Sequence, residues 1–364
     1  MIFDSPEMQI LREQYAGRHL YGVPPIVLVD RLDAFAQERD YMEHIISGAP
    51  ADKQKEWLKK RLFSTQWEQY LGGWFEMMLF GWLKQAGAVR IEPDIVGTKP
   101  DFLASIGQQE LIVEAKAHPI GPEERHQNDL MTELKYQVEQ IPLPYVIEIE
   151  ALRLEGMEAL DLVVESIRNW LNTEPDAPLI LDDPHIVFKA YRPPEYDLTT
   201  FETVQVLYSP EVLWIDPDYL RSSLLGKVRR YAPIKQSQYP LIIAYFIESA
   251  FFNVDEVVDV WFGKTTYTVD IASKNIKEAK CDQTGINYRN PNISKNISGL
   301  LVFKHGHCIE SPIPLQCWYV ENPFAIRPVN PFIFPAYAWF IKTETNNKHY
   351  RMEWVRNSTH DQDQ

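Results

Sequence analysis

The spacing of apolar residues between positions 65 and 117 predicts one helix followed by three strands. Over residues 65–86, apolar side chains recur at three- and four-residue steps, which is the period of a helix, and Gly87 ends this pattern. Three short runs of strand character follow at residues 89–95, 101–106 and 111–117. The glycine-containing segment 107–109 joins the last two runs and predicts a hairpin.

The rest of the chain predicts a mixture of helices and strands, so the fold class is expected to be α/β with a mixed sheet flanked by helices. Further helices are predicted at residues 129–141, 157–171 and 217–231, and further strands at 144–149, 186–191, 203–208, 241–246, 300–303 and 318–320. Three parts are expected: an N-terminal helical segment (1–63), a central domain (64–262) and a C-terminal β-rich extension with a polar tail (263–364).

Composition narrows the class of protein. The chain has 364 residues, of which 45% are apolar and 24% charged, an ordinary globular composition. Its net charge of −15 excludes nucleic-acid binding by bulk charge alone, so any phosphate contact must be local. Three cysteines are too few for a disulfide framework, and no apolar run approaches the length of about 18 residues that a membrane span needs. A soluble, cytoplasmic protein without a membrane partner is expected.

The segment 99–117 carries the most informative chemistry. Glu114 and Lys116 are two residues apart on a predicted strand, so their side chains leave the same face of the sheet. A hairpin turning near Gly107 would put Asp101 roughly opposite Glu114. Two facing carboxylates repel each other unless a cation lies between them, and such a pair, completed by waters and substrate phosphate, suits Mg²⁺. The alternative is an edge strand with solvated carboxylates and a salt bridge from Lys116.

This segment resembles the PD-(D/E)XK nuclease superfamily, which has the restriction-endonuclease-like fold. Pro100-Asp101 matches the PD element and Glu114-Ala-Lys116 matches the E-x-K element, and both follow a helix in the strand order of the family's core. The resemblance is specific over roughly residues 65–150. It implies a DNA nuclease that uses Mg²⁺, with Mn²⁺ as a substitute: Asp101 and Glu114 would hold the metal, and Lys116 would orient or activate water and steady the phosphate.

The family's core also usually carries a glutamate on the preceding helix, and Glu76 is the candidate, with Glu68 as a weaker one. The helix is apolar nearly all round, so Glu76 needs a partner. A metal-bound water or Lys116 would supply one, and the resemblance implies that Glu76 is a catalytic residue that binds a metal or its water. A hydrogen bond to a backbone or Trp N–H group is the alternative. Some branches place a Gln on the helix after the E-x-K strand, but the order and spacing of Tyr136-Gln137 do not match that pattern.

A local basic cluster is the candidate DNA contact. Residues 221–235 hold five basic side chains and no acidic one, and Lys227, Arg229 and Arg230 are expected on the exposed face of the predicted helix 217–231. The alternative is a solvated face, or pairing with the acidic helix 157–171. Restriction, repair and antiphage defence are the contexts that the resemblance suggests. A homodimer or a partner subunit of a defence system stays open.

Two rival functions come from other classes. The first is a catalytically silent module that binds nucleic acid or protein on the same fold, which would be marked by a broken motif. The second is an RNA nuclease, or a related hydrolase, with the same metal chemistry. Assays on DNA and RNA with and without divalent metal would distinguish them.

Overall fold

The structure is a computed structural model that describes residues 2–18, 20, 23–32, 35–119, 121–173, 177–192, 203–208, 217–230, 237–248, 253–269, 276–282, 284–305, 315–346 and 349–357. The chain divides into two compact units. The first consists of Met1–Arg12, Pro24–Pro119 and Ile215–Gln364, and the second of Glu13–Val23 and Ile120–Trp214. The second unit is therefore mainly an insertion between two parts of the first.

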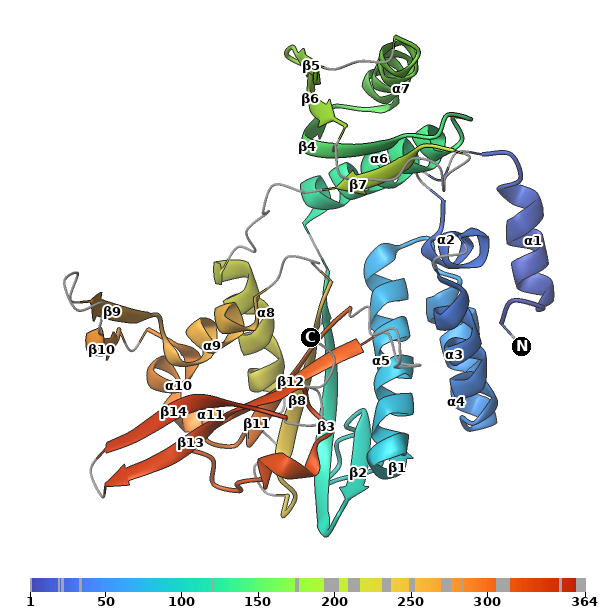
Figure 1. The fold of residues 1–364 in the computed structure, drawn as a ribbon. Helices are drawn as coiled ribbons and strands as arrows, with labels where there is room; N and C mark the ends of the chain where they lie inside the picture. Colours follow the sequence, from blue (N-terminus) through green and yellow to red (C-terminus); the bar gives the residue numbers. More distant parts are fainter. Residues whose placement is uncertain are drawn as a thin grey trace. The chain divides into compact units, whose positions relative to one another are not determined.

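Unit 1 is built on a large mixed sheet (Figure 1). Its described strands, eight in number, lie in the order β1-β2-β3-β8-β11-β12-β13-β14. Their bounds are β1 Gly87–Ile91, β2 Phe102–Ile106, β3 Gln109–His118, β8 Leu241–Ile247, β11 Gly299–His305, β12 Leu315–Glu321, β13 Ala338–Asn346 and β14 His349–Arg356. Strand β2 is antiparallel to both of its neighbours, β1 and β3, whereas β8 pairs with both β3 and β11 in parallel. The predicted α/β class with a mixed sheet flanked by helices is confirmed.

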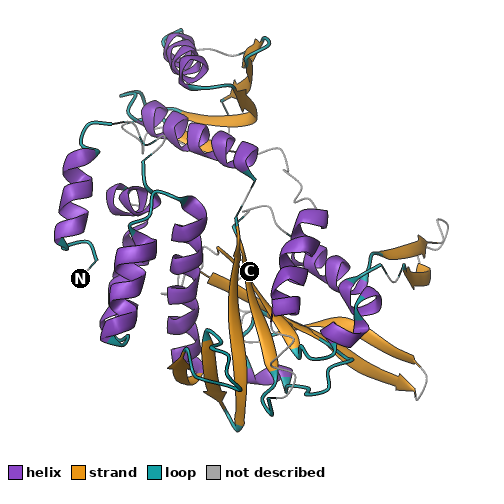
Figure 2. Ribbon diagram, turned by 180° about the vertical axis from the view of Figure 1, so that it is seen from behind, coloured by secondary structure: helices purple, strands orange, loops and turns teal. Residues whose placement is uncertain are grey.

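Helices cover both faces of this sheet (Figures 1 and 2). On one face lies α5, with the N-terminal helices beyond it; α8 and α9 lie on the other. The bounds are α1 Pro6–Gln14, α2 Pro25–Arg31, α3 Ala36–Ser47, α4 Ala51–Glu56, the π-helix η2 Trp57–Leu62, α5 Trp67–Ala86, α8 Pro217–Arg230, α9 Val254–Phe262, α10 Ile286–Arg289, α11 Pro291–Ser294 and the 3₁₀-helix η5 Pro331–Ile333. Because α5 contacts the sheet as well as α3 and η2, it is apolar nearly all round.

Successive side chains of the central strands point to opposite faces of the sheet. On β8, Phe246 stacks on Phe75 of α5, whereas Tyr245 belongs to an apolar cluster with Leu224 of α8. Ile112 of β3 lies in the same cluster as Tyr245. Every second residue of β3 from Ile112 onward therefore faces α8, and this includes Glu114.

Unit 2 has a smaller sheet of its own. Its described strands lie in the order β5-β6-β4-β7, with bounds β4 Val146–Leu154, β5 Leu179–Asp182, β6 Ile186–Tyr191 and β7 Gln205–Tyr208. Helices α6 (Pro122–Glu139) and α7 (Met157–Leu171) share its apolar core. Within the unit, the backbone N–H of Leu20 donates to the buried carboxylate of Glu133, at 2.5 Å. A two-stranded pair, β9 Thr265–Val269 and β10 Ile276–Cys281, belongs to unit 1.

The observed division of the chain does not coincide with the expected boundaries at residues 63 and 262. Strands β11 to β14 come from the expected C-terminal extension, yet they continue the sheet that contains β3. The regular elements described in the N-terminal part are helices, as expected. Within the described ranges, no helix is both long and apolar enough to cross a membrane. The polar tail at residues 360–364 lies outside the described residues.

Candidate functional site

The β2–β3 hairpin brings Asp101 and Glu114 together. Its two-residue turn begins at Gly107, whose φ of +60° lies in the left-handed region that glycine adopts without strain. The register pairs Phe102 with Val113 and therefore places Asp101 across from Glu114. The expected juxtaposition of the two carboxylates is confirmed.

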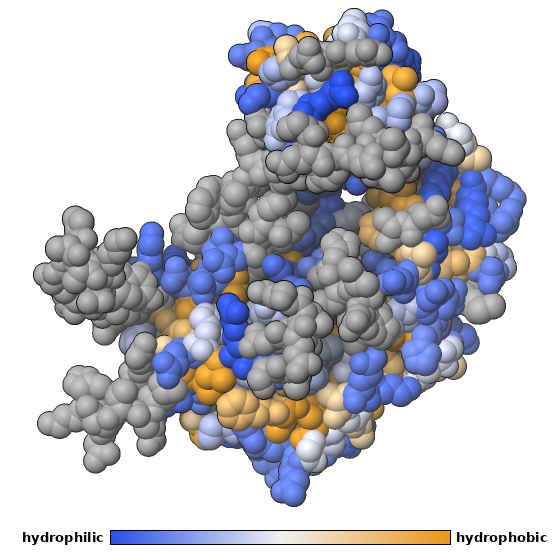
Figure 3. Space-filling view, in the orientation of Figure 1, coloured by the Kyte–Doolittle hydropathy of each residue, from blue (hydrophilic) through white to orange (hydrophobic). Residues whose placement is uncertain are grey.

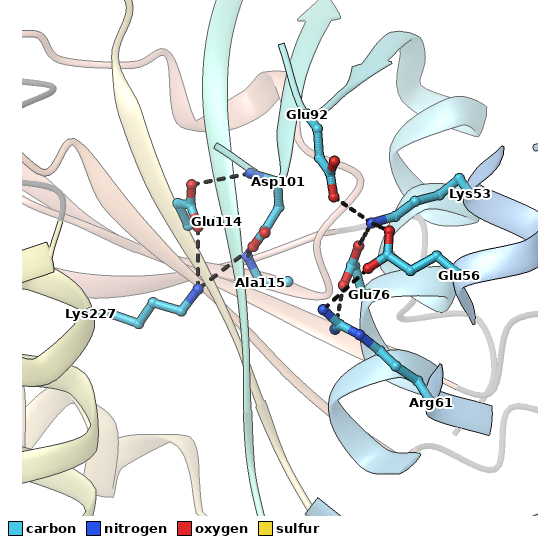
Figure 4. A network of polar contacts seen from close by, with 9 residues as sticks. All are labelled: Lys53, Glu56, Arg61, Glu76, Glu92, Asp101, Glu114, Ala115 and Lys227. Carbon is cyan, nitrogen blue, oxygen red and sulfur yellow. Dashed lines mark hydrogen bonds and ion pairs between the residues drawn. The ribbon is translucent and has the colours of Figure 1, made fainter. Parts of the chain in front are cut away.

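The two carboxylates flank one cationic side chain (Figure 4). The Nζ atom of Lys227 lies 3.2 Å from Glu114 Oε2 and 3.6 Å from Asp101 Oδ2. The hairpin backbone fixes the carboxylates, because the N–H of Asp101 donates to Glu114 Oε1 at 3.1 Å and the N–H of Ala115 donates to Asp101 Oδ2 at 2.8 Å. Glu114 Oε2, and Asp101 Oδ2, which also accepts the Ala115 N–H, thus converge on the position that the Lys227 ammonium fills.

Burial makes this cation necessary. The Glu114 side chain is 0% exposed, and β3 lies between β2 and β8 rather than at an edge. The alternative of an edge strand with solvated carboxylates is therefore wrong. A buried carboxylate without a counterion would carry a large desolvation cost, which the ammonium of Lys227 offsets.

Lys227 reaches the site from α8. Along this helix Leu220, Leu224 and Lys227 follow one another at steps of four and three residues, so all three share the face directed at the sheet. The leucines are fully buried and the Lys227 side chain is 14% exposed. The expectation that Lys227 lies on the exposed face of the helix is wrong, because its ammonium pairs with the carboxylates of the site. The side chains of Arg229 and Arg230 lie outside the described residues.

Lys116 extends the site along β3. It shares a strand face with Glu114, and burial, together with the positive charge of Lys227, lowers the pKa of its ammonium. Among the described residues, no carboxylate forms an ion pair with Lys116. Two residues further on, His118 is buried and its Nδ1 lies 2.9 Å from the hydroxyl of Tyr245; burial and then the charge of Lys116 lower its pKa to about 4. The site therefore contains one lysine that neutralises the carboxylates and a second that is not paired with them.

Glu76 belongs to a separate ion-pair cluster (Figure 4). Its Oε1 lies 2.7 Å from Nζ of Lys53, and its Oε2 lies 2.6 Å from a guanidinium nitrogen of Arg61. Lys53 also pairs with Glu56 at 3.1 Å and with Glu92 at 2.6 Å. The partners of Glu76 are thus two basic side chains from α4 and η2, rather than Lys116 or a Trp N–H group.

The location of α5 explains this difference. Because α5 covers the face opposite α8, Glu76 approaches the sheet from the side away from Glu114 and Lys116. Burial raises the pKa of Glu76; the charges of Arg61 and Lys53 oppose this shift, and the charge of Asp101 adds to it. Glu76 therefore lies within electrostatic range of Asp101, although its own oxygens are bound elsewhere.

Sequence reasoning did not identify Lys53 and Arg61 as partners of Glu76. A signal for Arg61 is present in α5: a Cβ atom at Gly73 would overlap the Arg61 side chain, so η2 can approach only where the helix has a glycine. The sequence around Lys53 gives no such signal for its ion pairs, because its partner Glu92 is distant in the chain. Gln137 belongs to unit 2, where its amide donates to Glu133 at 2.7 Å.

The donor set limits which metal this site could hold. In the part of the chain that the structure describes, no three His, Cys, Asp or Glu side chains are grouped as metal ligands. Asp101 and Glu114 supply two carboxylates, and Mg²⁺ is commonly bound by one or two carboxylates with waters and substrate phosphates. The chain matches no family model, no curated protein and no solved structure.

Proposed function

We propose that the chain is a Mg²⁺-dependent nuclease that hydrolyses phosphodiester bonds of DNA, with Mn²⁺ as a substitute, on a restriction-endonuclease-like core. One observation carries the proposal: Asp101 and Glu114 converge on a single cation position, with Lys116 on the same face of the same strand. The order of α5, β1, β2 and β3, with one half of the matching motif directly before β2 and the other on β3, also supports the resemblance to PD-(D/E)XK nucleases. A cytoplasmic location is part of the proposal.

The residues fit a divalent cation, because two carboxylates with waters and phosphate are a donor set that Mg²⁺ accepts, and one oxygen of each converges on the point where the Lys227 ammonium lies. Asp101 and Glu114 would hold the metal, which when bound supplies positive charge at the scissile phosphate and lowers the pKa of a bound water. The two backbone N–H bonds keep the carboxylates oriented. Lys227 must move away from them, and its flexible side chain permits this.

Lys116 has the charge and the position to act on the phosphate. Negative charge builds up on phosphate oxygens during hydrolysis, and a fixed cation beside them stabilises it. Because no described carboxylate pairs with Lys116, its ammonium need not break an ion pair to do so. We assign Lys116 to orienting or activating water and steadying the phosphate, and Glu76 to an electrostatic role near Asp101 through its cluster with Lys53 and Arg61.

A second candidate function is a binding module without turnover, and the position of Lys227 favours it. An ammonium between two carboxylates neutralises them without any metal, as in a purely structural ion cluster. The two functions differ in whether a divalent cation can replace that ammonium.

Incubation of the protein with plasmid DNA, single-stranded DNA and RNA, in Mg²⁺, Mn²⁺ or EDTA, tests the proposal. We expect cleavage of DNA in either metal and none in EDTA. Cleavage of RNA alone would replace DNA as the substrate. No cleavage of any substrate, together with retained nucleic-acid binding, would favour the binding module.

A further inference from the structure

A pocket of about 560 Å³ in unit 1 is lined by lysines from two separate parts of the chain. Lys53 and Lys55 come from α4, Lys59 and Lys60 from η2, and Lys99 from the segment before β2. A solvated helix face would explain the lysines of α4 and η2, but it does not explain why Lys99 converges on them. Figure 3 shows the surface over α4 as largely hydrophilic.

Most of this positive charge is not neutralised by carboxylates of the described residues. The buried Lys53 pairs with the pocket's two glutamates, Glu56 and Glu92, as well as with Glu76. The other four pocket lysines are exposed, and none of them forms an ion pair with a described carboxylate. Since Asp52 is the only remaining acid of the lining, the pocket is locally cationic in a chain of net charge −15. Gathering like charges in a concave site costs free energy unless an anion binds there.

The wall of the pocket adjoins Asp101 through the pairing of β1 with β2. The backbone N–H of Glu92, in the pocket wall, donates to the carbonyl of Asp101 at 2.9 Å. Glu92 itself has a φ of +45°, a conformation that is strained for a residue with a side chain and that is often found at functional sites. Lys99 precedes Asp101 by two residues. An extended anion that leaves the pocket past Lys99 would therefore reach the segment that carries Asp101.

We propose that this lysine pocket binds the phosphate backbone of the nucleic-acid substrate beside the scissile bond. The inference rests on the proposed function and identifies the surface by which this chain, of net charge −15, would hold its polyanionic substrate. Lys55, Lys59, Lys60 and Lys99 contact phosphates without reading bases, because their ammonium groups are flexible point charges. Lys53 is a positioning residue, since its own charge is bound by three glutamates.

The test measures the salt dependence of binding to a duplex DNA of about 20 base pairs, over about 50 to 200 mM NaCl, in a Lys116→Ala background that prevents cutting. The pocket variant is Lys55→Gln, Lys59→Gln and Lys60→Gln combined, since glutamine keeps helix propensity. The control combines Lys264→Gln, Lys295→Gln and Lys342→Gln, which remove the same charge outside the pocket. Circular dichroism melts establish that both are folded.

Each lost phosphate contact lowers the slope of log affinity against log salt by about 0.9, so the pocket variant should lose roughly two to three units and the control much less. Lys99→Gln alone should lose about one unit and provides a second measurement if the triple variant is unstable. Equal slopes in the pocket variant and the parent would overturn the pocket and leave the proposed function standing. A parent that binds neither duplex DNA nor single-stranded RNA at low salt would overturn both. Tight binding of an acidic protein with no binding of nucleic acid would also overturn the inference.

Discussion

Replacing Lys227 with methionine removes the cation between Asp101 and Glu114 and keeps most of the apolar stem. At separations of 3.2 and 3.6 Å, each attraction is about 5 kcal/mol with an effective dielectric constant of about 20, before the desolvation cost of the ammonium is subtracted. Removing one partner of a buried ion pair typically costs about 3–5 kcal/mol. Because Asp101 is partly exposed, we expect Lys227→Met to lower the free energy of unfolding by about 3 kcal/mol.

Urea unfolding with and without Mg²⁺ checks this expectation. Without metal, Lys227→Met should unfold at a clearly lower urea concentration than the wild type, whereas Lys264→Met, a change at an exposed lysine outside the site, should not. Mg²⁺ should then stabilise the variant more than the wild type, because the cation no longer competes with an ammonium. Unfolding of the variant at the wild-type urea concentration, or equal stabilisation by Mg²⁺ in both proteins, would refute this reasoning.

Three further expectations concern the surroundings of the site. Gly72→Ala should raise the free energy of unfolding by about 0.5–1 kcal/mol, because a methyl group at this position contacts no other atom. Gly73→Ala should lower the free energy of unfolding by about 1–3 kcal/mol, because its methyl group overlaps the Arg61 side chain. Equal effects of the two substitutions in urea unfolding would contradict the packing of η2 on α5. Burial raises the pKa of Glu38 from 4.5 to about 7, so its contribution to stability is fully present below pH 4.5 and is lost as the pH rises through about 7, on the order of 3 kcal/mol in all. Glu38→Gln should abolish this decline, and an unchanged decline would assign it to another group. Without metal, Asp101→Asn should change the free energy of unfolding by less than about 1 kcal/mol, because the lost attraction to Lys227 and the relieved repulsion from Glu114 offset each other. The same substitution should remove the stabilisation by Mg²⁺. Calorimetric unfolding with and without metal checks both expectations.

Local periodicity predicted the elements whose own residues determine them. The helix at 157–171 and the strand at 186–191 have the predicted bounds, because each shows a clear apolar period between polar ends. The hairpin and its register followed from one glycine-containing turn. By contrast, α6 begins at Pro122, earlier than predicted, because its first turns are polar.

Long-range pairing explains what the sequence did not show. Strands β5, β9, β10, β13 and β14 and helix α9 were not predicted, because strand stability depends on neighbours that are distant in the chain. The same limit applies to the site. The facing pair Asp101 and Glu114 lies within one hairpin and was predictable, whereas Lys227 enters after the insertion of unit 2. Lys227 shares a helix face with Leu220 and Leu224, which is a signal of burial. The basic residues around it favoured the prediction of an exposed side chain instead.

Mn²⁺ binding followed by electron paramagnetic resonance, combined with DNA cleavage by the same preparations, tests the central claim most directly. The wild type should bind Mn²⁺ and cleave, Lys116→Ala should bind Mn²⁺ without cleaving, and Asp101→Asn should do neither. This pattern of results distinguishes the metal-binding role of Asp101 from the role of Lys116 at the phosphate. Cleavage by Lys116→Ala at the wild-type rate, or Mn²⁺ binding unaffected by Asp101→Asn, would contradict the account.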